Sequence, residues 1–350
     1  TLLGLGYAKK NKDKININEK AIRGYLLENY PQQVLTTEKG LVQISLAALK
    51  KYPEGDPIVR SLISMADYEK LWTSYYTRLT GQTILHPSYD ILKSTGRTSS
   101  EADPMFPSIN IQQIPRDGGV RECFTAPPGR HLISIDFAGL EMCSAAQVCL
   151  KYVGSSVLAD VLNAGLDVHS NTAAMFMELS YDDFLALLHA GDSKAKKHRN
   201  LAKVFNLGLL GGLQPEKLVA AAFNTYTIDI SPAQAKAFVD VFYKTYPEIN
   251  VMMSALKKST KWGDVNGYET HGRFRSKCSQ TEVLNGFLLQ SPSADAVNEC
   301  VYQAVKFSKT SGGTAEIVAF IHDEVLISEL VDKAPATAVQ YSELLAKTLR

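Results

Sequence analysis

The sequence predicts an α+β fold, and three observations support this prediction. Residues 133–136 and 318–327 contain apolar, β-branched runs of the kind that forms buried strands, while residues 151–262 between them have a mostly helical pattern. Each strand-like run carries an acid at or beside its end, Asp136 in the first and Asp323 in the second. A carboxylate beside a buried strand is costly unless it is paired or bound to a metal. Two segments far apart in the chain are therefore expected to build one antiparallel sheet with acids at its strand ends.

The second acidic segment predicts a tight β-hairpin. Apolar residues resume at Val325, directly after His322, Asp323 and Glu324, so the acids fall at the turn. In extended backbone, Glu324 points to the face opposite that of Asp323. Two interpretations of Glu324 stay open at this point, an auxiliary metal ligand and a structural residue.

The helical pattern between the two acidic segments contains a basic stretch at residues 194–212. Arg199 and Lys203 are four positions apart, so they stack on one face of a helix, and Leu207 and Gly211 extend that face. Magnesium binds polyphosphates through one or two carboxylates and the phosphate oxygens, and Arg and Lys hold the remaining charge. Strand-end acids and a basic helix face together suit a polyphosphate substrate, although such a pair alone is typical of an ordinary helix surface.

Bulk properties are those of a globular protein with two or three subdomains, because 350 residues exceed what one core usually holds. A net charge of +1 neither indicates nor excludes a nucleic-acid partner. The 5 cysteines show no zinc spacing, and the odd count indicates reduced thiols, so we expect the cytoplasm of a bacterium or of an infected host cell. No apolar run is long enough for a membrane span and no signal peptide is visible. Because the chain begins at Thr1, we expect a fragment or processed product.

Four motifs in order resemble those of the family-A DNA polymerases, the DNA polymerase I family, with a bacteriophage member as one candidate source. The resemblance extends from about residue 16 to residue 342. The matching segments are 95–100 (TGRTSS, against T-G-R-x-S-S) with 111–115 (against Q-x-I-P) following it, then 136–141 (motif A), 199–212 (motif B) and 322–324 (motif C). Shorter matches lie at 167–169, 267–270 and 289–295.

The resemblance implies a right-hand polymerase with a helical thumb, an antiparallel-sheet palm and helical fingers. Residues 1–83 would form part of the thumb, 84–150 the first palm segment, 151–262 the fingers, and 263–350 the second palm segment.

The activity implied is template-directed DNA synthesis, in which deoxynucleotides are added to a primer 3′-hydroxyl by two-metal phosphoryl transfer and pyrophosphate is released. Asp136 and Asp323 would hold two Mg²⁺ ions, with Mn²⁺ as an alternative. The partners would be primer-template DNA and deoxynucleoside triphosphates; we expect a monomer without membrane contact, and an upstream exonuclease or other domain outside this chain. Two alternatives stay open, a single-subunit RNA polymerase and a catalytically degenerate scaffold that binds primer-template.

The same resemblance assigns the nucleotide-binding residues. Arg199, Lys203 and His169 would contact the triphosphate, and Lys203 would join Asp136, Asp323 and Glu324 as a catalytic residue. Glu141 would close the space beside the sugar 2′ position and so disfavour ribonucleotides, the alternative being an acid that favours a helix N-terminus.

Contacts with DNA are assigned in the same way. Arg97 and Gln290 would read the primer-terminal pair from the minor groove, where all correct pairs present common acceptors; loop and helix polarity is the alternative. His322 would support the hairpin near the primer end, or is a structural histidine. Arg121 matches a basic position before motif A, or is surface charge, and Gln112 belongs to the DNA-binding Q-x-I-P segment.

The sequence departs from the family pattern in motifs A and B. Leu207, which would lie against the nucleotide sugar and base, and Gly211 stand where the family usually has aromatic residues, and Ala138 and Gly139 replace polar ones. About ten extra residues lie near positions 180–193. The metal and phosphate ligands are intact, so we expect these changes to affect base selection, dideoxynucleotide discrimination and fidelity.

Overall fold

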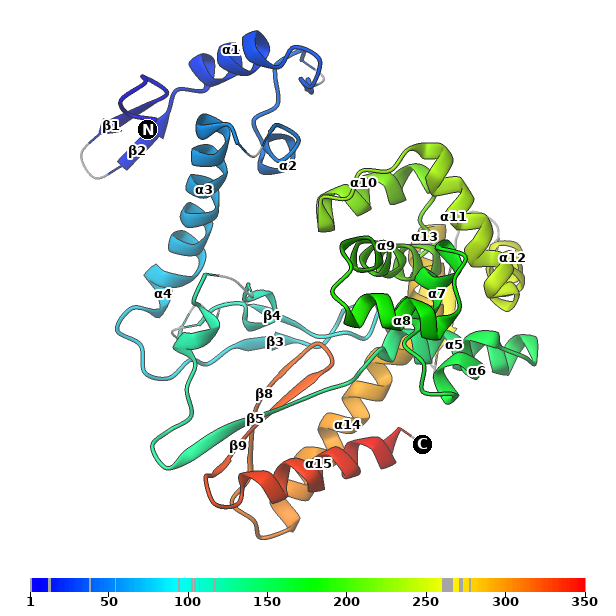
Figure 1. Cartoon of the computed structure of the whole chain (residues 1–350). Helices are drawn as coiled ribbons and strands as arrows, with labels where there is room; N and C mark the ends of the chain where they lie inside the picture. The colour runs from blue at the N-terminus through cyan, green and yellow to red at the C-terminus, as the bar shows by residue number, and fades with distance from the viewer. Residues whose placement is uncertain are drawn as a thin grey trace. The chain divides into compact units, whose positions relative to one another are not determined.

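The computed structural model describes the chain except residues 1, 12, 13, 38, 54, 94, 102, 104, 107, 116, 117, 260–266, 271, 272, 277 and 350. The chain divides into two compact units (Figure 1). The first contains Thr1–His86, Ala102–Ile109 and Pro115–Arg121, and the second contains Pro87–Glu101, Asn110–Ile114 and Glu122–Arg350.

The first unit is mainly helical. Its elements are β1 (Ala8–Asn11), β2 (Lys14–Ile17), α1 (Glu19–Asn29), α2 (Leu46–Leu49), α3 (Pro57–Leu71), the π-helical turn η1 (Trp72–Tyr76) and α4 (Thr77–Leu79). Asp56 caps α3 by accepting from the backbone N–H groups of Ile58 and Val59, and its other oxygen accepts the hydroxyls of Tyr25 and Tyr30, each at 2.5 Å. Burial raises the pKa of Asp56, but these hydrogen bonds outweigh burial and lower it. The buried carboxylate is thus satisfied inside this unit.

The second unit is built on a three-stranded antiparallel sheet with the strand order β5-β9-β8 (Figure 1). The strands are β5 (Arg130–Asp136), β8 (Glu316–Ile321) and β9 (Glu324–Leu330). β8 and β9 form the tight hairpin expected from the sequence, and β5 pairs with β9 despite their distance in the chain. The sheet is therefore the one that the two acidic segments predict.

One face of this sheet is covered by α14 (Ser291–Thr310) and α15 (Ala334–Thr348) (Figure 1). The side chains that share this core are Ile133, Ile135, Val325, Ile327, Cys300, Tyr341 and Leu345. Side chains alternate between the faces of a strand, so the residues between them on β5 lie on the opposite, exposed face. The sheet consequently has one apolar covered face and one open face.

A large helical region follows β5. Its helices are α5 (Leu140–Val153), α6 (Val157–Asn163), α7 (Val168–Phe176), α8 (Tyr181–His189), α9 (Ser193–Leu210), α10 (Pro215–Tyr226), α11 (Pro232–Thr245) and α12 (Pro247–Ser259). Phe205, Phe242 and Tyr246 are among the largest buried side chains of its core. Helix α9 runs through this core, which fixes the face that carries the predicted basic residues.

The remaining elements of the second unit are short. They are β3 (Ser88–Asp90), β4 (Ser99–Glu101), η2 (Ile111–Gln113), β6 (Gly267–Thr270), β7 (Arg273–Ser276), α13 (Gln280–Asn285) and the π-helical turn η4 (Gly286–Gln290), with η3 (Arg121–Cys123) at the junction of the two units. Helices and small antiparallel sheets together confirm the α+β class. The predicted boundary between residues 262 and 263 lies outside the described residues. No helix in the described part of the chain is both long and apolar enough to cross a bilayer.

Candidate active site

Acidic residues from two segments that are far apart in the sequence meet at one end of the sheet. Asp136, the last residue of β5, lies directly opposite Glu324, the first residue of β9. The N–H of Phe137 donates to the Asp323 carbonyl oxygen at 3.2 Å. His322 and Asp323 form the two-residue turn of the hairpin, and His322 has a φ of 57°. The left-handed region is one that His enters more readily than most residues.

The open face of the sheet carries two of these acids. Residues directly opposite on antiparallel strands point to the same face, so Asp136 and Glu324 share it. Ser134, two residues before Asp136, is on this face as well and donates its hydroxyl to Glu324 Oε1 at 2.5 Å. Asp136 is exposed and Glu324 is half-buried. Backbone pairing places these oxygen donors side by side, and Glu324 is held further by Ser134.

Asp323 lines a cleft in the second unit. Arg97, Glu141 and His322 also line it, together with Ala294, Val297 and Asn298 of α14. Carboxylate oxygens are the donors that Mg²⁺ prefers, and this ion usually takes one or two carboxylates and completes its shell with water and substrate phosphates. Across the described residues, no group of three or more His, Cys, Asp and Glu side chains could hold a metal ion. The acids at the strand ends fit an ion that the substrate helps to bind.

Arg97 and Glu141 form an ion pair at the side of this cleft. Glu141 lies in the first turn of α5, which begins after Gly139, a residue in the left-handed region with a φ of 65°. Glycine adopts this conformation without steric cost, which gives a physical reason for one departure from motif A. Two residues assigned separate roles from the sequence therefore contact each other.

The Gln112 side chain makes hydrogen bonds that hold the loop carrying Arg97. Its side-chain oxygen accepts the Ser100 N–H at 2.8 Å, and its side-chain nitrogen donates to Thr98 Oγ1 at 3.0 Å. The carbonyl oxygen of Gln112 lies 3.1 Å from His322 Nε2. The structure gives Gln112 and His322 internal partners, and their contact with DNA stays a prediction.

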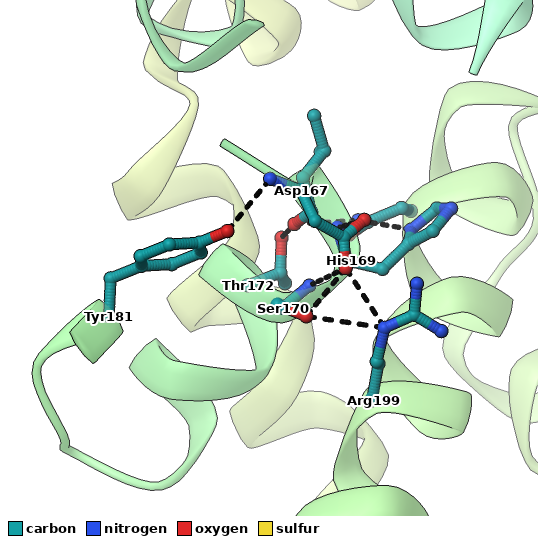
Figure 2. Close-up of polar contacts among 8 residues, drawn as sticks. Asp167, His169, Ser170, Thr172, Tyr181 and Arg199 are labelled. Atoms are coloured by element: carbon teal, nitrogen blue, oxygen red, sulfur yellow. Dashed lines mark hydrogen bonds and ion pairs between the residues drawn. The ribbon is translucent and has the colours of Figure 1, made fainter. Parts of the chain in front are cut away.

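A second cluster, on α7 and α9, holds Arg199 (Figure 2). Arg199 Nε donates to Asp167 Oδ2 at 2.9 Å and to Ser170 Oγ at 3.2 Å. Asp167 also caps α7 by accepting the N–H groups of His169 and Ser170, and its own N–H donates to the Tyr181 hydroxyl at 3.0 Å. Both hydrogen bonds of the guanidinium use Nε, and among the described residues its two terminal nitrogens make no hydrogen bond. They are available to an anion.

Electrostatics link the three predicted triphosphate ligands. The pKa of His169 is lowered to about 4, chiefly because the ring is buried; the positive charges of Arg199 and Lys203 also lower it, and Asp167 acts in the opposite direction. The pKa of Asp167 is lowered because the hydrogen bonds from Ser170 and Arg199 outweigh the effect of its burial. Arg199 and Lys203 therefore both lie within electrostatic reach of His169, which is neutral near pH 7.

The C-terminal half of α9 is tightly packed. Lys203 is exposed, while Leu207 is half-buried against the helical core. A Cβ atom on Gly208 would lie 2.6 Å from Leu218 Cδ2, so a larger residue there would require the Leu218 side chain of α10 to move. Gly211 ends the helix, and a side chain at this position would crowd the Leu207 carbonyl oxygen at 3.3 Å. The glycines of this segment thus follow from helix packing and helix termination.

Two other predicted DNA-binding residues belong to different units. Gln290 is half-buried at the end of η4, where the π-helical turn passes into α14. Arg121 is exposed and belongs to the first unit.

The sequence analysis assigned no role to four residues of this cluster: Asp167, Ser170, Tyr181 and Asn206, whose amide nitrogen lies 3.0 Å from His169 Nδ1. Asp directly before the apolar start of a helix is a recognised N-cap signal, and it identifies Asp167. Asn206 and Tyr181 carry no comparable signal, because their partners are far from them in the sequence.

Comparisons with known proteins agree with this architecture. The sequence model of DNA polymerase family A matches residues 7–349. DNA polymerase I of Aquifex aeolicus is 26% identical over 340 residues, which cover 95% of this chain and 54% of that protein. The DNA polymerase of Escherichia phage T5 is 24% identical over 352 residues, covering 90% of this chain and 39% of that protein.

A solved structure shares the fold. The POL domain of Pol1 from M. smegmatis, in complex with DNA primer-template and dNTP, superimposes with a TM-score of 0.72 at 19% identity, covering 99% of this chain and 59% of that one. The chain spans about half the length of Aquifex DNA polymerase I and less of the phage protein. The match to the family model extends over nearly all of the sequence. The chain belongs to DNA polymerase family A.

Proposed function

We propose that this chain catalyses template-directed DNA synthesis, adding deoxynucleotides to a primer 3′-hydroxyl with release of pyrophosphate. The observation that carries the proposal is that Asp136, at the end of β5, lies beside Asp323 of the hairpin turn and Glu324 of β9 at one end of the sheet. The family match and the DNA polymerases among its relatives support this activity over an RNA polymerase or a non-catalytic scaffold.

In this proposal Asp136 and Asp323 hold two Mg²⁺ ions, with Mn²⁺ as an alternative. Bound divalent ions would make the primer hydroxyl a stronger nucleophile and neutralise charge on the leaving pyrophosphate. Glu324 is an auxiliary ligand whose carboxylate is oriented by Ser134. The open face leaves the Asp136 carboxylate accessible to the primer end, and Asp323 lines the neighbouring cleft.

The α7–α9 cluster would bind the triphosphate. Arg199 is held at Nε by Asp167 and Ser170, so its terminal nitrogens are oriented before the nucleotide arrives. Such preorganisation makes a donor effective, because little reorganisation is needed when charge develops. Lys203, exposed one turn further along α9, adds charge and acts in catalysis, and Leu207 lies against the sugar and base.

The cleft beside Asp323 would hold the sugar and the primer-terminal pair. Glu141 closes the space beside the 2′ position, and its ion pair with Arg97 fixes both side chains. Arg97 and Gln290 contact the minor groove of the terminal pair. Gln112 holds the loop that carries Arg97, and His322, which contacts the Gln112 carbonyl oxygen, supports the hairpin near the primer end.

The larger organisation is part of the same proposal. Residues 1–83 form the thumb, 84–150 and 263–350 the palm, and 151–262 the fingers, and Arg121 contacts the DNA backbone. The partners are primer-template DNA and deoxynucleoside triphosphates, and the chain acts as a monomer in the cytoplasm.

Primer extension with Asp136→Ala tests the proposal. We expect the rate to fall by about 10³-fold or more, because the variant loses an ion ligand at the reacting centre. Asp332→Ala is the matched control, since this exposed aspartate follows the other end of β9 and carries the same charge. Full extension by Asp136→Ala would overturn the assignment.

The wild-type protein separates the alternatives. Incorporation of deoxynucleotides in preference to ribonucleotides supports the proposal, and the reverse preference indicates an RNA polymerase. Tight primer-template binding without extension indicates a scaffold.

A further inference from the structure

Asn206 is a fully buried polar residue on the same face of α9 as Arg199 and Lys203. Buried amides are almost always hydrogen-bonded. The Nδ2 of Asn206 lies 3.0 Å from His169 Nδ1 and 3.5 Å from the carbonyl oxygen of Val168. One nitrogen thus serves two acceptor positions on α7.

The carbonyl oxygen of Val168 sets the orientation of this amide. A carbonyl oxygen can only accept, so the NH₂ group of Asn206 must face it. The reversed orientation would place Oδ1 against that oxygen. It would also move the NH₂ group to the buried position of Oδ1, where no hydrogen-bond partner is present among the described residues. The amide nitrogen therefore faces His169 as a donor.

The orientation of the amide sets the tautomer of His169. Because the NH₂ group donates to Nδ1, this ring nitrogen must carry the lone pair. A neutral imidazole with an acceptor at Nδ1 has its proton on Nε2. The charged groups that act on the ring are Asp167 at the start of α7 and Arg199 and Lys203 on α9, and burial together with the two cations keeps it neutral. His169 is a neutral N–H donor among cationic side chains.

We propose that Asn206 is a positioning residue, which fixes His169 as the Nε2–H tautomer and aims that N–H at the triphosphate of the incoming nucleotide. This inference rests on the proposed function of the α7–α9 cluster. A neutral donor suits a site that already contains Arg199 and Lys203, because a third cation beside them would be repelled when no anion is bound. Asn206 touches no substrate and acts through His169.

Long-range ¹H–¹⁵N NMR spectra of the ¹⁵N-labelled wild-type protein test the tautomer directly. The His169 signal is identified as the one that disappears in His169→Gln. We expect an unprotonated Nδ1 and a protonated Nε2, unchanged between about pH 6 and about pH 8 because the pKa of His169 is about 4. A protonated Nδ1 in that range would overturn the inference, whatever the enzymatic activity.

A double-mutant cycle tests the route of action. We expect Asn206→Leu to raise the nucleotide KM by about 10-fold and to change kcat much less, since the loss of an orienting partner typically costs 10- to 100-fold. In a His169→Ala background the same substitution should cost less than about 2-fold. An equal cost in both backgrounds would show that Asn206 does not act through His169.

Two further comparisons keep the inference separate from the activity. Asn200→Leu, on the same helix and half-buried, is the matched control and should leave the KM unchanged. If Asn206→Leu fails to fold, the wild-type spectrum still decides the tautomer. An Nε2–H tautomer in a protein that never extends a primer would refute the proposed function alone, whereas extension with a protonated Nδ1 would refute the inference alone.

Discussion

The two charged clusters of the second unit are built in different ways. At the acidic end, Asp136 and Glu324 are brought together by strand pairing, and Asp136 is exposed. In the α7–α9 cluster, Arg199 is held by side-chain hydrogen bonds to Asp167 and Ser170, and about a third of its side chain is exposed.

The difference follows from the lengths of the side chains. A short Asp side chain has few rotamers, so a fixed backbone position nearly fixes its oxygen atoms. An Arg side chain loses much more conformational entropy when it is ordered, so it needs partners along its length. The acidic end depends on the sheet register, whereas the basic cluster depends on a hydrogen-bond network. Each dependence can be tested by substitution.

The largest expected effect separates two neighbouring acids. We expect Asp323→Asn to lower primer extension by about 10³-fold or more, and Glu324→Gln by about 10-fold or less, because Glu324 is already bonded to Ser134 and its amide keeps an acceptor there. Single-turnover extension at saturating nucleotide measures both. Equal losses of extension rate in the two variants would show that Asp323 and Glu324 have the same role, although one lies in the turn and the other on β9.

The next effect concerns the basic cluster. Arg199→Lys keeps the positive charge, but a lysine side chain has only one nitrogen. It cannot bond Asp167, as the arginine Nε does, and also present two terminal nitrogens to a phosphate. We expect kcat/KM for nucleotides to fall by about 10²-fold. Lys196→Ala removes an exposed cation from the same helix and should change kcat/KM by less than about 2-fold. A similar loss in both variants would mean that charge alone matters.

The pH dependence of stability sharpens the contrast, because His169 belongs to the network and not to the sheet. Its folded-state pKa of about 4 is below the ordinary value of 6.5, so between these values the unfolded chain binds the proton and the folded chain does not. Stability is therefore lost as pH falls through this window, by about 2 kcal/mol between about pH 7.5 and about pH 5.

Urea unfolding of the wild type and of His169→Gln at both pH values measures this contribution. His169→Gln should lack the loss of stability that protonation of His169 causes in the wild type. An identical pH dependence of stability in the two proteins would contradict the lowered pKa of His169. Asp167 acts in a different range: its pKa is lowered, so the stability it adds is present above its ordinary value of 3.8 and is lost only at lower pH.

The smallest expected effect concerns Tyr181, the outermost member of the hydrogen-bond network around Asp167 and Arg199. Tyr181→Phe removes the hydroxyl that accepts the N–H of Asp167. We expect a loss of about 1 kcal/mol in the free energy of unfolding and less than about a 3-fold rise in the nucleotide KM. A rise of about 10²-fold in the nucleotide KM would match the loss in kcat/KM expected for Arg199→Lys. It would show that α8, which begins within the extra residues near positions 180–193, controls the orientation of Arg199.

Much of the acidic end could be predicted from the sequence. The strand-like runs beside Asp136 and Asp323 indicated the sheet, and the apolar residues after Glu324 indicated the hairpin. Short-range patterns are sufficient here because register is set by which residues are apolar on the covered face. The ion pair between Arg97 and Glu141 was not predictable, since nothing local connects these two residues.

The order of motifs and the alternation of apolar residues in the chain determined the family, the fold class and the types of side chain available for chemistry. Tertiary structure alone decided which of these side chains restrain one another: Gln112 holding the Thr98–Ser100 loop, Asp167 holding Arg199, and Asn206 facing His169. Periodicity reports only the face of a helix or strand on which a residue lies, because it depends on neighbours within a few positions. Hydrogen bonds between distant segments depend on distances and angles that exist only once the helices have packed.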